Sequence, residues 1–242
     1  MINKKKIVAL IPARSGSKGL KNKNILNLKG NPLIHYPITA AKDSLYVDRI
    51  IVSTDSEKIA DIAKTHGAEV PFLRPLNLAS DTTTSSEVII HMLETLNTEL
   101  ADFEYLILLE PTSPLTTGND IDRALIELDS NNKFTALTSV AKIESNHPEY
   151  CLSINDNKIQ PYKGKFPGKA MRRQEIEDLY FLDGSLYLSR IKNFIKTKSF
   201  YHEKTLPFIV PYWKSFEIDT YLDLICIEAI MNNIDEIQVK ND

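Results

Sequence analysis

The sequence of 242 residues contains only two cysteines, and this scarcity argues against a disulfide framework. Cys151 and Cys226 lie far apart, and neither has a CxxC partner or a histidine cluster nearby. We therefore expect two reduced, packed thiols and no zinc site. The five histidines match no metal-binding spacing, so we expect them at packing or surface positions: His35, His66, His91, His147 and His202.

Long apolar runs and a strong charge imbalance are also missing. No stretch approaches the roughly 20 apolar residues of a membrane span. The basic start of the chain is followed only by the apolar run 7–12, which is too short for an export signal. The net charge of −3 gives no general attraction to nucleic acid. We expect a cytoplasmic protein without a membrane or nucleic-acid partner, so any anion site must be local.

Glycine is sparse, and its positions form neither of two common nucleotide-binding motifs. The GxxxxGK[ST] loop is absent, and so is the GxGxxG dinucleotide fingerprint. A P-loop ATPase and a dinucleotide-binding enzyme are therefore disfavoured. No internal repeat is visible, so a solenoid or propeller is not expected.

The hydrophobic pattern alternates between buried strands and amphipathic helices. Residues 7–11, 49–53 and 105–109 are continuous apolar runs of the kind that forms strands buried on both faces of a parallel sheet. Further strands are predicted at 134–140, 179–188 and 207–211, and helices at 33–42, 56–65, 85–96, 120–128 and 221–231. This order predicts one α/β domain over residues 1–242, with its ligand site at the carboxyl ends of the strands.

One segment departs from this pattern. Residues 143–178 are polar, contain Pro148, Pro161 and Pro167, and lose helical periodicity. We interpret the segment as an insertion in the α/β domain.

The loop after the first strand is the most informative polar segment. It places glycines, small hydroxyl residues and the cations Arg14, Lys18 and Lys23 directly after a buried strand. Gly16 and Gly19 allow close backbone approach, and the cations can neutralise a polyphosphate. A solvated basic turn is the alternative interpretation.

Several motifs in this sequence resemble the CMP-sialic acid synthetases (acylneuraminate cytidylyltransferases), a family that includes CMP-legionaminic acid synthetases. The loop reads IPARxxSKG over residues 11–19 and continues with Lys23-Asn24. Similar family segments follow in family order, at 51–55 (IVSTD), 73–75 (LRP), 78–82 (LASDT), 111–115 (PTSPL), 172–174 (RRQ) and 218–220 (IDT). Each segment alone is a weak signal, but the ordered set is specific.

This resemblance implies a fold and a reaction. The fold would be a three-layer, mostly parallel, Rossmann-like (GT-A-like) nucleotidyltransferase sheet, with segment 143–178 as a dimerisation arm. The reaction would join CTP to a nine-carbon 2-keto sugar acid, N-acetylneuraminate or a legionaminate, with Mg²⁺ as cofactor. It would release pyrophosphate, and the enzyme would be a homodimer. By this resemblance Arg14, Lys23 and Asp219 are catalytic, and the nucleotide-binding residues are Arg14, Ser17, Lys18, Lys23, Asn24, Arg74, Ala79, Ser80, Asp81 and Ser85.

The sugar pocket departs from the family pattern at two places. Glu110 stands where the family commonly has Gln, and Asp183 lies in a segment that lacks a common arginine. Arg172 or Arg173 is then expected to hold the sugar carboxylate, because Arg suits bidentate recognition. The predicted sugar-binding residues are Glu110, Arg172, Arg173, Gln174 and Asp183.

Other carboxylates and hydroxyls have both a binding and a helix-capping interpretation. Glu217 and Asp219 are predicted magnesium ligands on one side of an extended segment, although both could instead cap the last helix. The hydroxyls of residues 82–86 could cap the helix that follows them, bind nucleotide, or do both. Asp55 could bind a metal ion or ribose, but a structural role is favoured, as a cap of the helix after the second strand.

Two rival functions remain open at this stage. The first is a related cytidylyltransferase that acts on KDO or pseudaminate, which would differ only in its pocket residues. The second is a nucleotide-binding homologue that has lost catalysis, because a fold alone does not guarantee a function.

Overall fold

A computed structural model describes residues 1–17, 19–162 and 176–241 of the chain. Its main sheet has six strands in the order β10-β6-β9-β5-β1-β4. Only β9 runs antiparallel to its neighbours, so the predicted mostly parallel α/β sheet is confirmed. The strands are β1 (Lys6–Pro12), β4 (Arg49–Ser53), β5 (Phe103–Leu108), β6 (Ala136–Lys142), β9 (Tyr180–Arg190) and β10 (Thr205–Val210).

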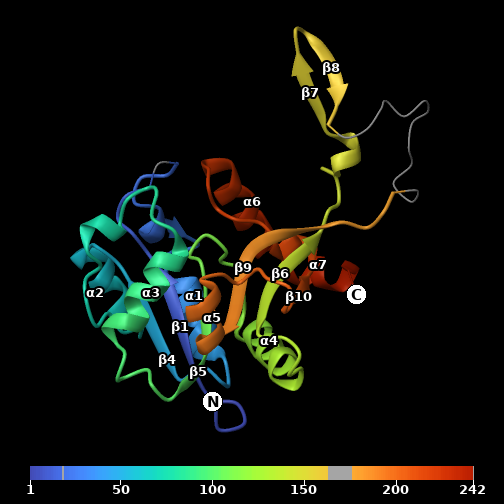
Figure 1. Cartoon of the computed structure of the whole chain (residues 1–242). Helices are drawn as coiled ribbons and strands as arrows, with labels where there is room; N and C mark the ends of the chain where they lie inside the picture. Colours follow the sequence, from blue (N-terminus) through green and yellow to red (C-terminus); the bar gives the residue numbers. More distant parts are fainter. Residues whose placement is uncertain (18, 163–175, 242) are drawn as a thin grey trace.

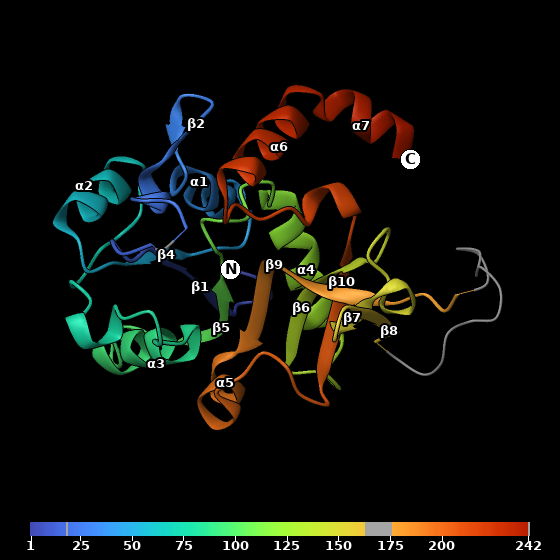
Figure 2. The ribbon, with the colours of Figure 1, turned by 90° about the horizontal axis from the view of Figure 1, so that it is seen from above.

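Helices cover both faces of the sheet and make three layers, as Figure 2 shows. The side chains of β1 alternate between two cores. Ile7, Ala9 and Ile11 belong to the core under α1, α2 and α4, whereas Val8 and Leu10 belong to the core under α3 and α5. All five β1 side chains have no exposed surface, which explains the unbroken apolar run in the sequence. The helices are α1 (His35–Asp43), α2 (Glu57–Thr65), α3 (Ser85–Thr95), α4 (Gly118–Ser130) and α5 (Ile191–Thr197).

A third apolar cluster fixes the end of the chain near the loops that follow β1 and β5. It joins Leu28 and Leu33 to Leu115, Ile218 and the helix α6 (Tyr221–Asn232). The amide of Ile218 donates to the Thr112 carbonyl at 2.8 Å, and Lys214 forms an ion pair with Asp120 at 2.5 Å. These contacts bring residues 216–219 to the carboxyl edge of the sheet.

The insertion begins with a short 3-10 helix, η3 (Pro148–Tyr150), and an antiparallel hairpin of β7 (Leu152–Asn155) and β8 (Lys158–Pro161). The hairpin stands away from the rest of the domain (Figure 1). Its side chains include Leu152, Ile154 and Ile159, all of which are exposed in the single chain.

Every strand and helix that the sequence predicts is present, and no end differs by more than two residues. The smaller elements were not predicted. They are the short strands β2 (Asn27–Leu28) and β3 (Asn31–Pro32), the hairpin β7–β8, the helices α5 and α7 (Ile234–Asn241), and the 3-10 helices. None of the helices in the described part of the chain has the length and apolar character that crossing a membrane requires.

Candidate active site

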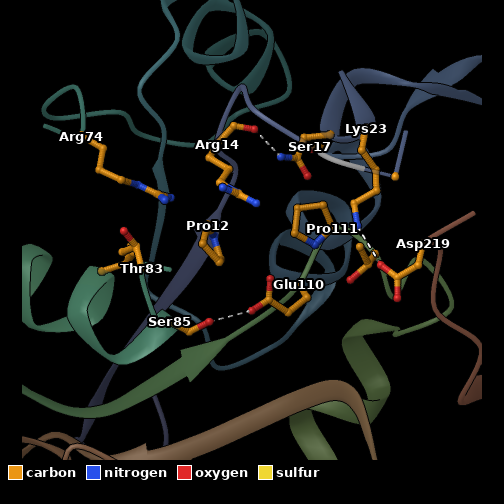
Figure 3. Close-up of a pocket in the computed structure, with 14 residues that line it drawn as sticks. Pro12, Arg14, Ser17, Lys23, Arg74, Thr83, Ser85, Glu110, Pro111 and Asp219 are labelled. Atoms are coloured by element: carbon orange, nitrogen blue, oxygen red, sulfur yellow. Dashed lines mark hydrogen bonds and ion pairs between the residues drawn. The ribbon is translucent and has the colours of Figure 1, made fainter. Parts of the chain in front are cut away.

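A cavity of about 400 Å³ opens where the loops after β1 and β5 meet the start of α3 (Figure 3). The chain reaches it from four distant segments, so no single motif contains all of its residues. Predicted residues that line it are Arg14, Ser17, Lys23, Asn24, Arg74, Ser85, Glu110 and Asp219. Gly19 and Thr83 also line it, and the sequence had indicated both, in the loop after the first strand and in the hydroxyl-rich segment. Lining residues that the prediction missed are Pro12, Val88, Pro111 and Thr112.

The Asp55 carboxylate anchors the loop after β1, although the sequence predicted Asp55 to be a helix cap. Asp55 accepts the Ser15 amide at 2.7 Å and the Ser15 hydroxyl at 2.6 Å. These hydrogen bonds lower the pKa of Asp55 against the opposing effect of its partial burial. The sequence predicted that Asp55 caps α2, and this prediction is wrong. The neighbouring Ser56 caps the helix, because its side chain accepts from the Ile59 amide. Asp55 holds Ser15 between the two cavity residues Arg14 and Ser17.

Arg14 is tied to the segment that contains Ala79 and Asp81. Its guanidinium pairs with the Asp81 carboxylate at 2.7 Å and donates to the Ala79 carbonyl at 3.4 Å. Asn24, which is buried, donates from its side chain to the Arg14 carbonyl at 2.8 Å. The predicted nucleotide residues Arg14, Asn24, Ala79 and Asp81 therefore form one connected group.

Lys23 and Asp219 form an ion pair at the edge of the cavity although they are 196 positions apart in the chain. The Lys23 ammonium lies 3.0 Å from an Asp219 carboxylate oxygen. Gly19 packs closely against the Asp219 backbone, since a Cβ at Gly19 would lie 2.5 Å from its carbonyl oxygen. This contact explains why the position needs a residue without a side chain.

Arg74 is buried, bonds its own loop to the end of β4, and lines the cavity. It donates to the Ser53 hydroxyl at 3.0 Å and to the Ser53 carbonyl at 2.5 Å, and it is only 5% exposed. Burial lowers the pKa of Arg74 to about 10, with the nearby Asp55 and Glu110 charges opposing the shift. The guanidinium therefore stays charged at neutral pH.

Some residues of the hydroxyl-rich segment before α3 cap the helix, and others line the cavity. Thr84 caps α3 and forms a capping box with Glu87. Ser80 contacts the hydroxyls of Thr82 and Thr83 at 3.1 and 2.8 Å. Thr83 and Ser85 line the cavity, so both interpretations of the segment hold at different residues.

Glu110 lies on the wall of the cavity, within 3.4 Å of the Ser85 hydroxyl. Burial raises the pKa of Glu110 to about 7, and the negative charge of Glu217 adds to the shift. The Ser85 hydrogen bond and the Lys23 and Arg74 charges oppose it. A neutral carboxyl can donate a hydrogen bond, whereas the ionised form only accepts.

A second cavity, also of about 400 Å³, lies between the base of the arm and residues 212–223. Asp183 and Glu217 border it together with the aromatic residues Phe181, Tyr212 and Phe216. Asp183 is 1% exposed and accepts the Ser185 hydroxyl at 2.7 Å. Burial, with the Asp219 and Asp183 charges, raises the pKa of Glu217, although the Ser113 hydroxyl bonds to it.

The two predicted metal ligands border different cavities. Asp219 lines the first cavity, whereas Glu217 lines the second. Within the described ranges, no three His, Cys, Asp or Glu side chains form a group that could hold a metal ion. Mg²⁺ is nevertheless commonly held by one or two carboxylates plus substrate phosphates. Asp219, next to the cation-rich loop, fits that arrangement.

Neither Asp219 nor Glu217 caps α6, the helix that follows them. Thr220 and Asp223 form the capping box of α6, and Asp223 also accepts the Asp219 amide at 3.1 Å. The capping interpretation is therefore wrong for both residues. Four predicted site residues lie outside the described part of the chain: Lys18, Arg172, Arg173 and Gln174.

Comparison with known proteins shows the family of the chain. A family model described as "Cytidylyltransferase" matches residues 8–224. The matched range begins in β1 and ends in α6, so it spans both walls of the first cavity.

Curated relatives show similarity along nearly the whole chain. The CMP-N,N'-diacetyllegionaminic acid synthase of Legionella pneumophila is 37% identical to this chain. The alignment covers 93% of this chain and 96% of that relative. An N-acylneuraminate cytidylyltransferase of Escherichia coli is 35% identical over 90% of this chain, which spans about half (50%) of that relative. A pseudaminic acid cytidylyltransferase of Campylobacter jejuni is 30% identical over 90% of this chain and 93% of its own.

The fold also matches a solved structure. CMP:2-keto-3-deoxy-manno-octonic acid synthetase, solved in complex with CTP, superposes with a TM-score of 0.68 at 16% sequence identity. The match covers 94% of this chain and 99% of that one. Because the sequence identity is only 16%, this match shows similarity of fold alone.

Proposed function

The chain belongs to the cytidylyltransferase family, as a nucleotidyltransferase of the acylneuraminate cytidylyltransferase type, and we propose that it joins CTP to a nine-carbon 2-keto sugar acid. The products would be pyrophosphate and a CMP-sugar. The observation that carries the proposal is the first cavity, which Arg14, Lys23 and Asp219 line together. Cations and a carboxylate in one cavity suit a triphosphate that arrives with a divalent ion.

The cations of the loop after β1 would hold the phosphates. Arg14 and Lys23 reach the cavity, and Lys18 is assigned to the same group from the sequence alone. Phosphoryl transfer depends mainly on positioning and on neutralising charge at the phosphate oxygens. Both are tasks for fixed cations, and Asp55 supplies the fixed anchor through Ser15.

The remaining residues around the cavity would bind the nucleoside. We assign Asn24, Arg74, Ala79 and Ser85 to cytosine and ribose, with Ser17, Ser80 and Asp81 beside them. Arg74 is buried and bonded to Ser53, so it offers a rigid edge. Rigid groups lose less conformational entropy when a ligand binds.

Asp219 would hold Mg²⁺ together with the phosphates of CTP. When bound, the ion would supply charge neutralisation at the phosphate oxygens. The anomeric hydroxyl of the sugar would attack the α-phosphorus, so that an O–P bond forms, the bond to the β-phosphate oxygen breaks, and the hydroxyl proton is released to solvent. Arg14 and Lys23 then stabilise the negative charge on the leaving pyrophosphate. The reaction needs no covalent enzyme intermediate.

The second cavity would receive the sugar acid. Asp183 lines it, Glu110 lies on the wall of the first cavity, and Arg172, Arg173 and Gln174 are assigned to the sugar from the sequence alone. The relatives named for diacetyllegionaminic and N-acylneuraminic acids favour a substrate of that type. KDO and pseudaminate are the alternatives, and the pseudaminic acid cytidylyltransferase relative keeps the second of these open.

The test is pyrophosphate release with CTP and Mg²⁺ in the presence of N-acetylneuraminate, di-N-acetyllegionaminate, pseudaminate or KDO. Release with one sugar supports the reaction and identifies the substrate. Asp219→Asn should reduce kcat by about 100-fold or more, because the metal carboxylate is lost. CTP binding without release for any sugar would instead favour a homologue that has lost catalysis.

We also propose that the arm joins two copies of the chain into a homodimer. The hairpin β7–β8 is too thin to bury its own apolar side chains, and an isolated two-stranded hairpin is marginally stable in water. Burial of Leu152, Ile154 and Ile159 against a second copy would remove that exposed apolar surface. The assignment to the cytoplasm rests on the sequence and stays a prediction.

A further inference from the structure

We propose that Glu217 is a sugar-contacting residue of the second cavity and not a ligand of the magnesium ion. This inference rests on the proposed function, because it assigns a residue to the sugar acid. It concerns a carboxylate that sequence reasoning had grouped with Asp219. The geometry of residues 217–219 separates the two.

The two carboxylates border different cavities, although their charges interact. Residues two apart share a face only in a regular strand, and residues 215–218 form no strand. Ile218 is fully buried between them, and its amide is bonded to Thr112. Asp219 borders the first cavity with a side chain that is 72% exposed, whereas Glu217 is partly buried and borders the second.

The Glu217 carboxylate is fixed in its position by two neighbours. Ser113 donates its hydroxyl to a Glu217 oxygen at 3.2 Å. Gly184 leaves the space that the carboxylate fills, because a Cβ there would lie 2.1 Å from a Glu217 oxygen. Gly184 also has a φ of +76°, a backbone conformation in which a residue with a side chain would be strained. The carboxylate is therefore held in place without a metal ion.

The chemistry of the second cavity suits a sugar that offers hydrogen-bond donors. Ionised carboxylates only accept, so Asp183 and Glu217 would bind hydroxyl or amide N–H groups. One Asp183 oxygen is buried and has no hydrogen-bond partner among the described residues. The aromatic rings of Phe181, Tyr212 and Phe216 supply an apolar wall for the C–H faces of the ring. We infer a substrate with hydroxyl and acylamino donors on the side that faces Glu217.

Glu217→Gln and Asp219→Asn are matched tests, because each replaces one carboxylate by an amide of the same shape. The first measurement is Mn²⁺ binding by electron paramagnetic resonance, with Mn²⁺ as the metal probe and CTP present. The second is the steady-state KM for CTP and for the sugar acid that the wild-type chain uses. CTP binding by calorimetry and a thermal melt confirm that each variant is folded.

We expect Glu217→Gln to raise the KM for the sugar acid about tenfold or more, because an acceptor for a substrate donor is lost. Its Mn²⁺ affinity and its KM for CTP should stay within about twofold of the wild-type values. Asp219→Asn should show the reverse pattern, with Mn²⁺ affinity lowered about tenfold or more. Glu217→Asp, which shortens the side chain by one methylene, should also raise the sugar KM.

The proposal is overturned if Glu217→Gln weakens Mn²⁺ binding as Asp219→Asn does while the sugar KM stays unchanged. It is also overturned if both values stay at the wild-type level. The proposed function has its own test, which uses only the wild-type chain. If the wild-type chain releases no pyrophosphate and binds none of the four sugar acids in calorimetry, the proposed function fails before any variant is compared.

Discussion

Single side chains in this protein carry tasks that neighbours in the sequence do not reveal. Asp55 follows β4 at the position where a helix cap is common, yet it bonds to Ser15 across the cavity edge. Ser56 performs the capping task one residue later. The loop after β1 thus takes its shape from a residue 40 positions away.

We predict that Asp55→Asn impairs nucleotide binding more than turnover. The amide keeps one acceptor oxygen but loses the second, so Ser15 is held by one hydrogen bond instead of two. The KM for CTP should rise about tenfold, while kcat changes by less than about threefold. Steady-state kinetics with varied CTP measure both values.

Ser15→Ala provides the matched control, because it removes only the hydroxyl bond and keeps the amide bond. Its KM should rise to a similar extent, because each variant leaves residue 15 held by one hydrogen bond instead of two. A fall in kcat with unchanged KM in Asp55→Asn would instead indicate direct participation in the reaction.

Glu110 should make the stability of the empty protein depend on pH. Its pKa in the folded protein is about 7, above the ordinary value of 4.5. The folded protein therefore binds more protons than the unfolded chain between these values, and this contribution to stability is lost as pH rises from about 5 to about 7. Glu110→Gln, which cannot ionise, should be more stable than the wild type by about 1–3 kcal/mol at pH 8 and by less at pH 5.

Urea unfolding at pH 5, 6, 7 and 8 measures this difference for the wild type and for Glu110→Gln. The two stability curves should diverge as pH rises. Parallel curves over this range would show that Glu110 ionises in the folded protein as easily as in the unfolded chain.

At the scale of elements, the start of α3 links helix stability to the cavity. Thr84 caps the helix, and the next residue, Ser85, lines the first cavity. α4 carries an equivalent capping box formed by Thr117 and Asp120, and neither of these residues lines that cavity. The two caps form a matched pair that separates stability from binding.

We predict that Thr84→Ala and Thr117→Ala each lower the free energy of unfolding by about 1 kcal/mol. The melting temperature should fall by about 2–4 °C in both variants. Only Thr84→Ala should also raise the KM for CTP, by about threefold to tenfold. Thermal melts and CTP kinetics measure these effects, and equal KM values in the two variants would contradict the link.

At the scale of the whole molecule, the hairpin β7–β8 of the arm exposes apolar side chains in the single chain. Ile154 and Ile159 pair directly across the hairpin and are 74% and 57% exposed. Apolar surface of this kind is a mark of an interface. The rest of the domain has its own cores and does not depend on the arm for packing.

We predict that the wild-type chain is a dimer and that the double variant Ile154→Glu with Ile159→Glu is a monomer at micromolar concentration. The melting temperature measured for the monomer should reflect only the loss of the partner, because both side chains are exposed within one chain. Light scattering gives the mass of each form. Leu76→Glu, at a site that is 80% exposed and distant from the arm in sequence, is the control and should stay dimeric. A monomeric wild-type chain would refute the prediction.

The sequence predicted the fold well because local patterns determine the individual elements. Five fully buried β1 residues gave an unambiguous strand, and hydroxyl caps at Thr84, Thr117 and Thr220 mark where helices begin. The short strands β2 and β3 were missed because two residues give no periodicity. α5 was missed because its seven residues are too few for a helical pattern.

By itself, the sequence determined the element order, the cation-rich loop and the family resemblance, because each depends on residues that are close together in the chain. Only the tertiary structure decided which side chains share a cavity. It brought Lys23 to Asp219, paired Asp55 with Ser15, and placed Glu217 and Asp219 at different cavities. The positions of Glu217 and Asp219 depend on the buried Ile218 and its bond to the Thr112 carbonyl, and such long-range packing leaves no periodic signal in the sequence.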